Sequence, residues 1–219
     1  MALKSGFDEQ YNFLKKIKMF ERFNLELVET AKPLVIPKER WRKTEANIAT
    51  ISYGHGISVT PLHVLAGFNA VVNGGVYYYP SFISGRQNGE RVISDNTSRH
   101  MRKFLRSVVV KGSGKKADVA GYEVGGKTGT AEKVSSKGKY DGSHKHNTFV
   151  SAFPMSNPQY SLLVMMDEPQ AVDSYFSTAG FNVVPASAEI ISTIAPQLNI
   201  MPKYDDKYIS DVKLIEASY

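Results

Sequence analysis

Residues 121–133 hold the densest set of groups with chemical potential in this chain of 219 residues. They run Gly-Tyr-Glu-Val-Gly-Gly-Lys-Thr-Gly-Thr-Ala-Glu-Lys, and the stretch from Gly121 to Thr128 satisfies the phosphate-binding pattern G-x-x-x-x-G-K-[ST]. In such a loop, the lysine and the N–H groups at the start of a helix bind nucleotide phosphates. Taken by itself, the pattern predicts a nucleotide-binding enzyme.

The neighbouring sequence argues against a phosphate loop. Such a loop opens directly into a helix, whereas Thr128 is followed by a glycine and soon by the polar, turn-forming run 135–143. Residues 120–125 alternate between apolar and small or polar side chains, which is typical of a strand. No convincing apolar strand ends in an aspartate for magnesium. We therefore predict a strand over 121–131.

On a strand, the run Lys127-Thr128-Gly129-Thr130 matches the third signature of the penicillin-recognising serine transferases. A glycine at position 129 lets an extended substrate lie against the backbone, while alternate side chains point into the site. On these four residues alone, a surface strand end with a solvated lysine is the better explanation. The flanking chain decides between the two.

Segment after segment, the flanking chain resembles class B penicillin-binding proteins, the division-type (penicillin-binding protein 3-like) peptidoglycan D,D-transpeptidases. The resembling segments are 51–62 before a buried helix, the strands at 121–131, 147–154 and 160–169, and the aromatic loop and final helix at 175–185. The resemblance covers about residues 5–195. It implies an α+β fold, a partial transpeptidase (serine β-lactamase-like) domain whose antiparallel sheet is flanked by helices and which misses its N-terminal strands and nucleophile helix.

The same family has two further motifs, Ser-x-x-Lys with the acylated serine and Ser-x-Asn, and neither occurs here in its expected context. Ser113, Ser136 and Ser210 each begin a Ser-x-x-Lys match, but the first two lie in Gly/Lys-rich loops and the third lies near the chain end. We interpret all three as chance. Ser94-Asp95-Asn96 imitates the second motif and is better explained as the N-cap of a helix over 97–109.

We therefore expect residues 1–195 to be the C-terminal portion of one transpeptidase domain that begins after the second motif, and residues 196–219 to be a tail. The nucleophile is then absent from this chain, and the chain alone should neither transpeptidate nor acylate with penicillin.

The resemblance also implies roles for individual residues. Lys127 would place positive charge beside the second-motif serine and help to move protons. The hydroxyls of Thr128 and Thr130 would hold the terminal carboxylate of a D-Ala-D-Ala stem peptide or of a β-lactam, beside Gly129. The Thr130 N–H would form half of the oxyanion hole, so Lys127 and Thr130 are the predicted catalytic residues. Tyr175 and Phe176 would form an apolar wall over the substrate; ordinary loop packing explains them equally well.

Composition excludes several other functions. The net charge of +6 is spread through loops without an aromatic-interleaved basic stripe, so we predict no nucleic-acid partner. There is no cysteine, and no apolar run approaches the about 18 residues of a membrane helix. His144 and His146 lack accompanying carboxylates or cysteines, so we expect no metal and no cofactor. By resemblance, the intact parent is anchored in the inner membrane with this domain on the periplasmic side, and the fragment itself is soluble.

Three function hypotheses follow. The first is the C-terminal part of a septal D,D-transpeptidase that binds stem peptides, β-lactams and division proteins. The second is a non-catalytic binding or scaffolding module that keeps the fold, which differs from the first in the motifs encoded upstream. A stand-alone hydrolase is disfavoured because it too needs the missing serine. Without the family's neighbouring strand, Leu162, Val164 and Met165 would leave an apolar sheet edge, which predicts self-association.

The elements that must position the motif follow from pattern and punctuation. We predict an amphipathic helix over 6–19, an irregular segment over 20–48 with Trp41 as a packing anchor, and a short extended segment over 76–82. Thr60-Pro61 is a strong helix start, and this helix should bury Leu62, Leu65, Phe68 and Val72. Strands near 147–154 and 160–167 and a helix over 185–194 should complete the α+β order.

Overall fold

The computed structural model describes residues 1–86, 88–134, 140–170 and 177–204. The chain divides into two compact units, Met1–Arg99 and His100–Tyr219, with the boundary inside helix α5 (Asp95–Lys111). The predicted grouping of residues 1–195 into one domain, with a tail from 196, stays a prediction. Residues 205–219 of that tail lie outside the described residues.

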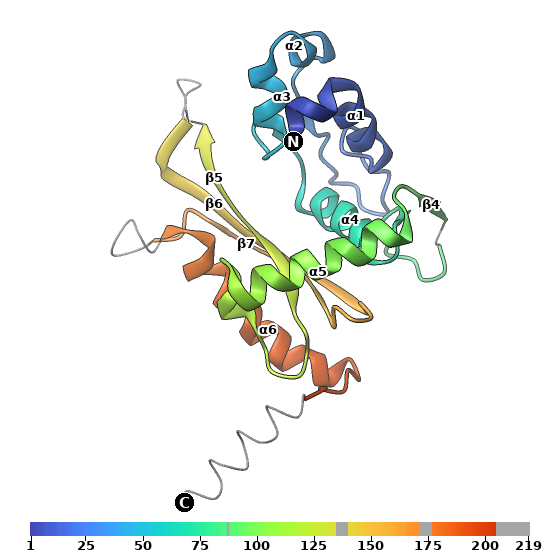
Figure 1. The fold of residues 1–219 in the computed structure, drawn as a ribbon, viewed down its shortest axis with the longest axis vertical. Helices are drawn as coiled ribbons and strands as arrows, with labels where there is room; N and C mark the ends of the chain where they lie inside the picture. The colour runs from blue at the N-terminus through green and yellow to red at the C-terminus, as the bar shows by residue number, and fades with distance from the viewer. Residues whose placement is uncertain (87, 135–139, 171–176, 205–219) are drawn as a thin grey trace, which may run out of the picture. The chain divides into compact units, whose positions relative to one another are not determined.

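The first unit is made of helices and two short antiparallel strand pairs (Figure 1). Strand β1 pairs with β2, and β3 pairs with β4. In chain order the elements before α5 are α1 (Ala2–Lys16), β1 (Leu34–Val35), α2 (Lys38–Arg42), α3 (Glu45–Ile51), β2 (Ile57–Ser58), α4 (Pro61–Val72), β3 (Val76–Tyr78) and β4 (Gly89–Arg91).

Helix α4 begins where the sequence predicts it. The Thr60 hydroxyl accepts a hydrogen bond from the His63 N–H, at 3.4 Å, and Pro61 occupies the first helical position. The predicted buried stripe is right in part: Val72 is fully buried, whereas Leu62, Leu65 and Phe68 are half-buried, and Leu62 packs against a buried cluster. The other residues that α4 buries are His63, Ala66, Gly67 and Ala70. Small residues occupy the buried face of α4 because neighbouring side chains approach it closely. A Cβ on Gly67 would lie 2.6 Å from Cε of Met19.

The segment 20–48, predicted to be irregular, contains helix α2 and the first part of α3, so that prediction is wrong for Lys38–Arg42 and from Glu45 to residue 48. A local cap explains the second helix, because the Thr44 hydroxyl accepts from the Asn47 N–H at 3.2 Å. Trp41 is fully buried and its Nε1–H donates to Gln10 Oε1 at 3.1 Å. The prediction that it anchors packing is confirmed.

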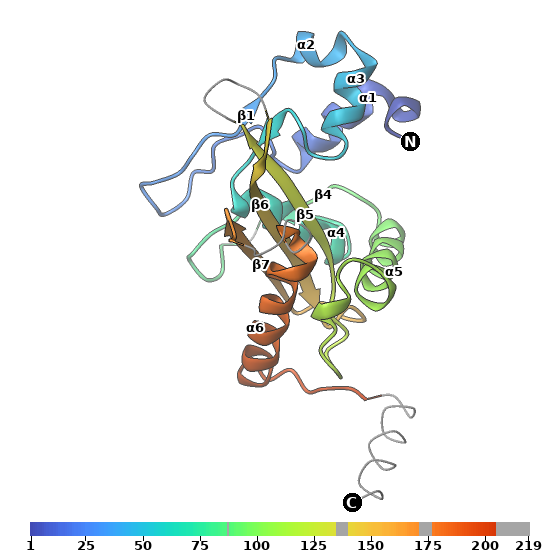
Figure 2. The ribbon, with the colours of Figure 1, turned by 90° about the vertical axis from the view of Figure 1, so that its left-hand side faces the viewer.

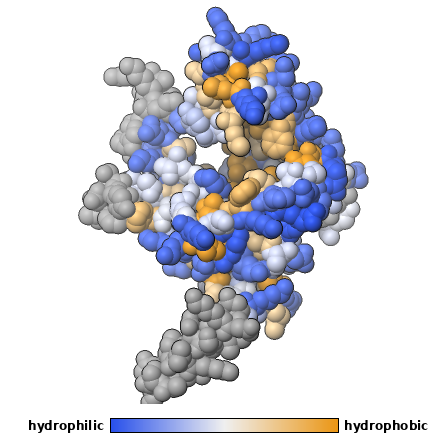
Figure 3. Space-filling view, viewed as in Figure 1, coloured by the Kyte–Doolittle hydropathy of each residue, from blue (hydrophilic) through white to orange (hydrophobic). Residues whose placement is uncertain are grey.

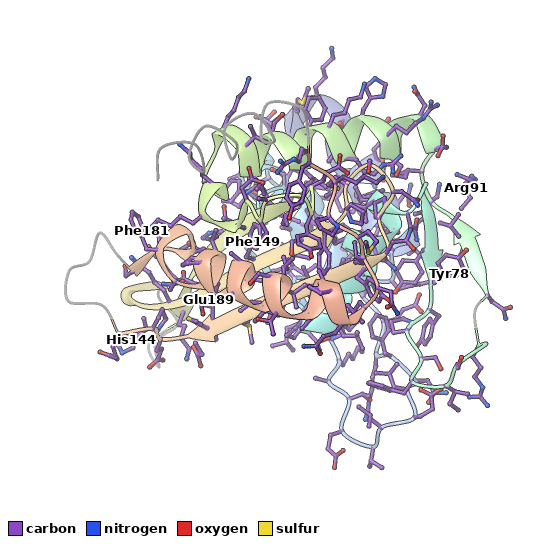
Figure 4. All side chains as sticks on the ribbon, turned by 90° about the horizontal axis from the view of Figure 1, so that it is seen from below. Tyr78, Arg91, His144, Phe149, Phe181 and Glu189 are labelled. Carbon is purple, nitrogen blue, oxygen red and sulfur yellow. The ribbon has the colours of Figure 1, made fainter. Side chains whose placement is uncertain are left out.

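The second unit is built on a three-stranded antiparallel sheet, with strand order β5-β6-β7. Helix α6 lies along the sheet (Figure 2), and Phe149 of β6 is fully buried in a core with residues of α5 and α6, including Val109 and Val183 (Phe149 is labelled in Figure 4). The elements after α5 are the 3-10 turn η1 (Lys115–Ala117), β5 (Gly125–Val134), β6 (Tyr140–Phe153), β7 (Tyr160–Asp167), the 3-10 turn η3 (Ala179–Phe181) and α6 (Val183–Gln197).

The predicted cap of α5 is confirmed, since the Ser94 hydroxyl accepts from the Thr97 N–H at 3.0 Å. Most of the surface in Figure 3 is hydrophilic, with scattered apolar patches, which agrees with a net charge spread over the chain. In the described part of the chain, no helix combines the length and apolarity required to cross a membrane.

Candidate active site

Strand β5 carries the Lys-Thr-Gly-Thr motif at the edge of the sheet. It pairs with β6 along one side, and among the described residues no strand lies along the other. The strand continues past Thr128 to Val134, so no helix follows the motif and the phosphate-loop interpretation is wrong. It begins at Gly125, later than predicted, because Gly121 and Glu123 have positive φ angles of 82° and 46°. An edge strand of this kind can accept an extended peptide.

The pleat of β5 separates the motif onto two faces of the sheet. Lys127 lies opposite Val150, whereas Thr128 lies opposite the buried Phe149. Directly opposed residues of an antiparallel pair project to the same side, so Thr128 and Thr130 share the face that carries Phe149. Lys127 projects from the other face, is exposed, and donates from Nζ to the carbonyl of Thr128 at 2.7 Å.

The two threonines line a pocket of about 400 Å³. Each hydroxyl has a partner from a distant part of the chain: the oxygens of Thr128 and Ser113 lie 2.7 Å apart, and the Ala179 N–H donates to Thr130 Oγ1 at 3.2 Å. The remaining lining residues come from the α5–η1 turn, from η1, and from η3 with the residue before it, namely Gly112, Lys115, Lys116, Thr178, Gly180 and Phe181. The lining contains two ammonium groups and no carboxylate, so the pocket suits an anion.

Gly129 is not required by the packing of this unit. A Cβ added there would meet nothing closer than Thr148 Cβ, at 3.8 Å. The glycine at 126 is different, because a Cβ there would lie 2.4 Å from the Val150 carbonyl oxygen and 2.7 Å from Cζ of Phe149. Among the described residues the fold explains Gly126 and leaves Gly129 open to an approaching molecule.

A buried amide holds the wall of the pocket in place. Asn147 of β6 is fully buried, and its Nδ2 donates to the Ser177 carbonyl at 2.6 Å and to Asn182 Oδ1 at 3.2 Å. Asn147 lies opposite Thr130 in the sheet, so it supports the segment whose Ala179 N–H reaches that threonine. Sequence reasoning missed Asn147 and Ala179 and assigned no site role to Ser113, because their partners lie far away along the chain.

The other predicted residues are distributed as follows. Tyr175 and Phe176 lie outside the described residues. Ser113 lies exposed in the turn after α5, not at the start of a buried helix, while Ser136 and Ser210 also lie outside the described part.

The predicted absence of a metal concerns His144 and His146. Across the described ranges, no group of three or more His, Cys, Asp or Glu side chains is arranged to hold a metal ion. His146 instead places Nδ1 3.0 Å from Asp167 Oδ1. Lys133 contacts the same aspartate. Its hydrogen bonds with Glu168 and Asp167 raise the pKa of its ammonium group.

The fold and the motif together are those of a penicillin-binding protein transpeptidase domain. The sequence profile of the penicillin binding protein transpeptidase domain matches residues 1–189. This chain therefore belongs to the penicillin-binding protein transpeptidase family, and its similarities lie with the division-type class B members. The sequence-based prediction of family and fold is confirmed.

Individual relatives show how similar this chain is to known transpeptidases in sequence and in structure. The chain is 34% identical to the probable peptidoglycan D,D-transpeptidase FtsI of Caulobacter vibrioides, over 93% of this chain and 36% of that protein. It matches the apo transpeptidase domain of Burkholderia pseudomallei penicillin-binding protein 3 with a TM-score of 0.82 and 28% identity, over 93% of this chain and 61% of that one. A complex of Mycobacterium tuberculosis penicillin-binding protein 3 with ampicillin matches with a TM-score of 0.79 and 27% identity, over 90% of this chain and 47% of that one. The chain thus spans about a third of its curated relative's length.

Proposed function

We propose that this chain is the C-terminal part of a serine-type peptidoglycan D,D-transpeptidase. The intact protein would cross-link D-Ala-D-Ala stem peptides during septal wall synthesis and would bind penicillin. One observation carries the proposal: an edge strand presents two threonine hydroxyls and a glycine that the packing does not require. The likeness to an ampicillin complex supports a β-lactam as an alternative ligand.

The proposed roles follow the two faces of β5. An extended peptide would pair with the open edge over Gly129, and its terminal carboxylate would accept hydrogen bonds from Thr128 and Thr130. The Thr130 N–H would donate to the oxyanion, and loss of one such donor typically costs about 100- to 1000-fold in rate. Lys127, on the opposite face, would face the catalytic serine supplied from outside this chain. Tyr175 and Phe176 would cover the bound ligand.

We also propose that this chain alone neither transpeptidates nor is acylated by penicillin, because it lacks Ser-x-x-Lys and Ser-x-Asn in their family context. The test is labelling with fluorescent penicillin. The chain alone is compared with a fusion in which the upstream transpeptidase segment of the Caulobacter relative precedes it, and with the same fusion whose nucleophilic serine is replaced by alanine.

We expect a covalent band from the active fusion only. A band on the isolated chain would contradict the predicted inactivity. A folded fusion that fails to label would instead favour the non-catalytic scaffolding module.

Two further parts of the proposal concern location and assembly. The intact protein would be anchored in the inner membrane, would act in the periplasm and would meet division proteins there. The isolated chain would self-associate along β7, where no partner strand lies on the outer edge within the described residues and Met165 is exposed. Leu162 and Val164 pack partly against the core, so the pairing would use mainly the free backbone edge. Light scattering over a concentration series tests this, and a monomer at the highest concentration would exclude it.

A further inference from the structure

We propose that Ser113 is a positioning residue of the carboxylate site, and that Lys116 supplies positive charge to the same pocket. Ser113 acts through Thr128 by fixing the direction in which that hydroxyl donates its proton. This inference rests on the proposed function and deepens it, because it assigns a recognition role to the turn between α5 and η1. It also gives a use to a Ser-x-x-Lys match that does not serve as a nucleophile.

The hydroxyl protons of Thr128 and Thr130 must both be available to donate to a bound carboxylate. A threonine hydroxyl has one proton to donate and lone pairs that accept. The Ala179 N–H already donates to Thr130 Oγ1, at 3.2 Å, so the Thr130 proton is left for a ligand. The Thr128 proton is available in the same way only if Ser113 donates across their 2.7 Å contact. A carboxylate bound to Thr128 selects that arrangement, since an ionised carboxylate only accepts.

The turn that carries Ser113 is held in place by backbone hydrogen bonds and by packing. The N–H groups of Gly112 and Gly114 both donate to the Val108 carbonyl, at 3.0 Å and 3.1 Å. Gly114 is buried, and a Cβ there would lie 3.2 Å from Cγ2 of Val109. The turn is therefore held against the core while Ser113 itself stays exposed. A Cβ on Gly180 would lie 3.2 Å from the Ser113 carbonyl oxygen, so the two walls of the pocket approach closely there.

The pocket also carries positive charge. Lys115 and Lys116 both line the pocket. Lys116 is the better fixed of the two, because its Nζ lies 4.2 Å from the centre of the Phe181 ring. A carboxylate in the pocket would meet one ammonium group held in place, next to two hydroxyl donors. Hydrogen bonds to charged groups are roughly twice as strong as neutral ones, so orienting the hydroxyls matters most for an anionic ligand.

The test uses this chain with N-acetyl-D-alanyl-D-alanine as the probe and its C-terminal amide as the matched uncharged ligand. Affinity is measured by following the backbone amide signals of the pocket in ¹H–¹⁵N NMR titrations. The variants are Ser113→Ala, the conservative Ser113→Thr and Lys116→Gln. Ser107→Ala is the control, because Ser107 is an exposed serine of the same unit that does not line the pocket. Thermal unfolding confirms that each variant is folded.

We expect Ser113→Ala to weaken binding of the acid about tenfold and to leave the amide unchanged, since one charge-assisted hydrogen bond loses its orientation. Ser113→Thr should retain wild-type affinity. Lys116→Gln should weaken the acid and reduce the dependence of its affinity on salt. A merely structural role for Ser113 would change acid and amide affinity equally.

Two results would overturn the inference, and they differ in what else they affect. If the wild-type chain prefers the acid and Ser113→Ala binds it equally well, Ser113 has no positioning role and the proposed function stands. If the wild-type chain does not distinguish acid from amide, the pocket is not a carboxylate site, and the proposed function loses its recognition step as well.

Discussion

Two of the three glycines of the motif strand, Gly126 and Gly129, allow a direct separation of folding from function. Gly126 and Gly129 both lie in β5, and each is to be replaced by alanine in turn. A Cβ on Gly126 would lie 2.4 Å from the Val150 carbonyl oxygen and 2.7 Å from the ring of Phe149, which is fully buried. Neither group can move without disturbing the sheet or the core. We expect Gly126→Ala to lower the free energy of unfolding by about 1–3 kcal/mol, as overpacked sites do.

Gly129→Ala should act in the opposite direction. The nearest atoms to its new Cβ are Thr148 Cβ at 3.8 Å and the Thr148 carbonyl oxygen at 3.9 Å, which are ordinary contacts. The backbone there does not have a positive φ angle, so alanine fits without strain. Alanine restricts the unfolded chain more than glycine does. We expect Gly129→Ala to raise the free energy of unfolding by about 0.4–1 kcal/mol.

The assay is urea unfolding of both variants followed by circular dichroism, together with NMR titration of N-acetyl-D-alanyl-D-alanine. Gly129→Ala should be at least as stable as the wild type and should lose peptide binding, because the new methyl group occupies the space in which an extended ligand would lie. If it destabilised the chain as much as Gly126→Ala, the glycine would serve the fold. If it were stable and bound the peptide undiminished, the predicted close approach over residue 129 would be wrong.

Three further predictions test the surroundings of the site and the first unit. Ser94→Ala should lower the free energy of unfolding by about 1 kcal/mol through loss of the α5 cap, with Ser94→Thr as the retaining control, both measured by urea unfolding. Asn147→Ala should destabilise by about 1–3 kcal/mol and speed hydrogen exchange at the Ala179 amide, since Asn147 secures that segment; unchanged exchange would count against this support. Hydrogen bonds from Ser81 and then from the Phe82 N–H lower the pKa of Glu26 from 4.5 to about 2, so the tether of this loop is complete above about pH 4.5 and weakens as the pH falls toward 2. The Phe82 amide signal of the folded chain should titrate near pH 2, well below the usual value for a glutamate, and should lose this transition in Glu26→Gln.

Local signals predicted much of the fold. The caps at Thr60 and Ser94 depend on residues three positions apart, and both lie where the sequence indicates. The predicted stripe of α4 was only partly right, because which residues are fully buried depends on Met19, which lies far from Gly67 in the sequence and packs close to it. The short helices α2 and α3 were missed because α2 is five residues long and mostly charged, and α3, with seven residues, is too short to show a clear helical period.

The candidate site was likewise predicted only in part. The motif strand and its edge follow from residues 125–134 and from the resemblance of the flanks. The partners of the two threonines do not, because Ser113 lies 15 positions from Thr128 and Ala179 lies 49 positions from Thr130. Only folding brings these groups together, and no local pattern marks them. Ser113 even carries a misleading signal, since its Ser-x-x-Lys spacing imitates a nucleophile.

The positions of these partners separate the proposed carboxylate recognition from the proposed bond formation. The partners of Thr128 and Thr130 both belong to the second unit, so within the described residues this unit alone orients the two hydroxyls. Lys127 differs, because its Nζ donates to the Thr128 carbonyl on the same strand, and its proposed role requires a serine supplied from outside this chain. Carboxylate recognition should therefore be measurable in this chain alone, while bond formation should require the upstream serine. If recognition also appeared only after the upstream segment was added, the hydroxyls would not be organised by Ser113 and Ala179, and the separation of the two functions would be wrong.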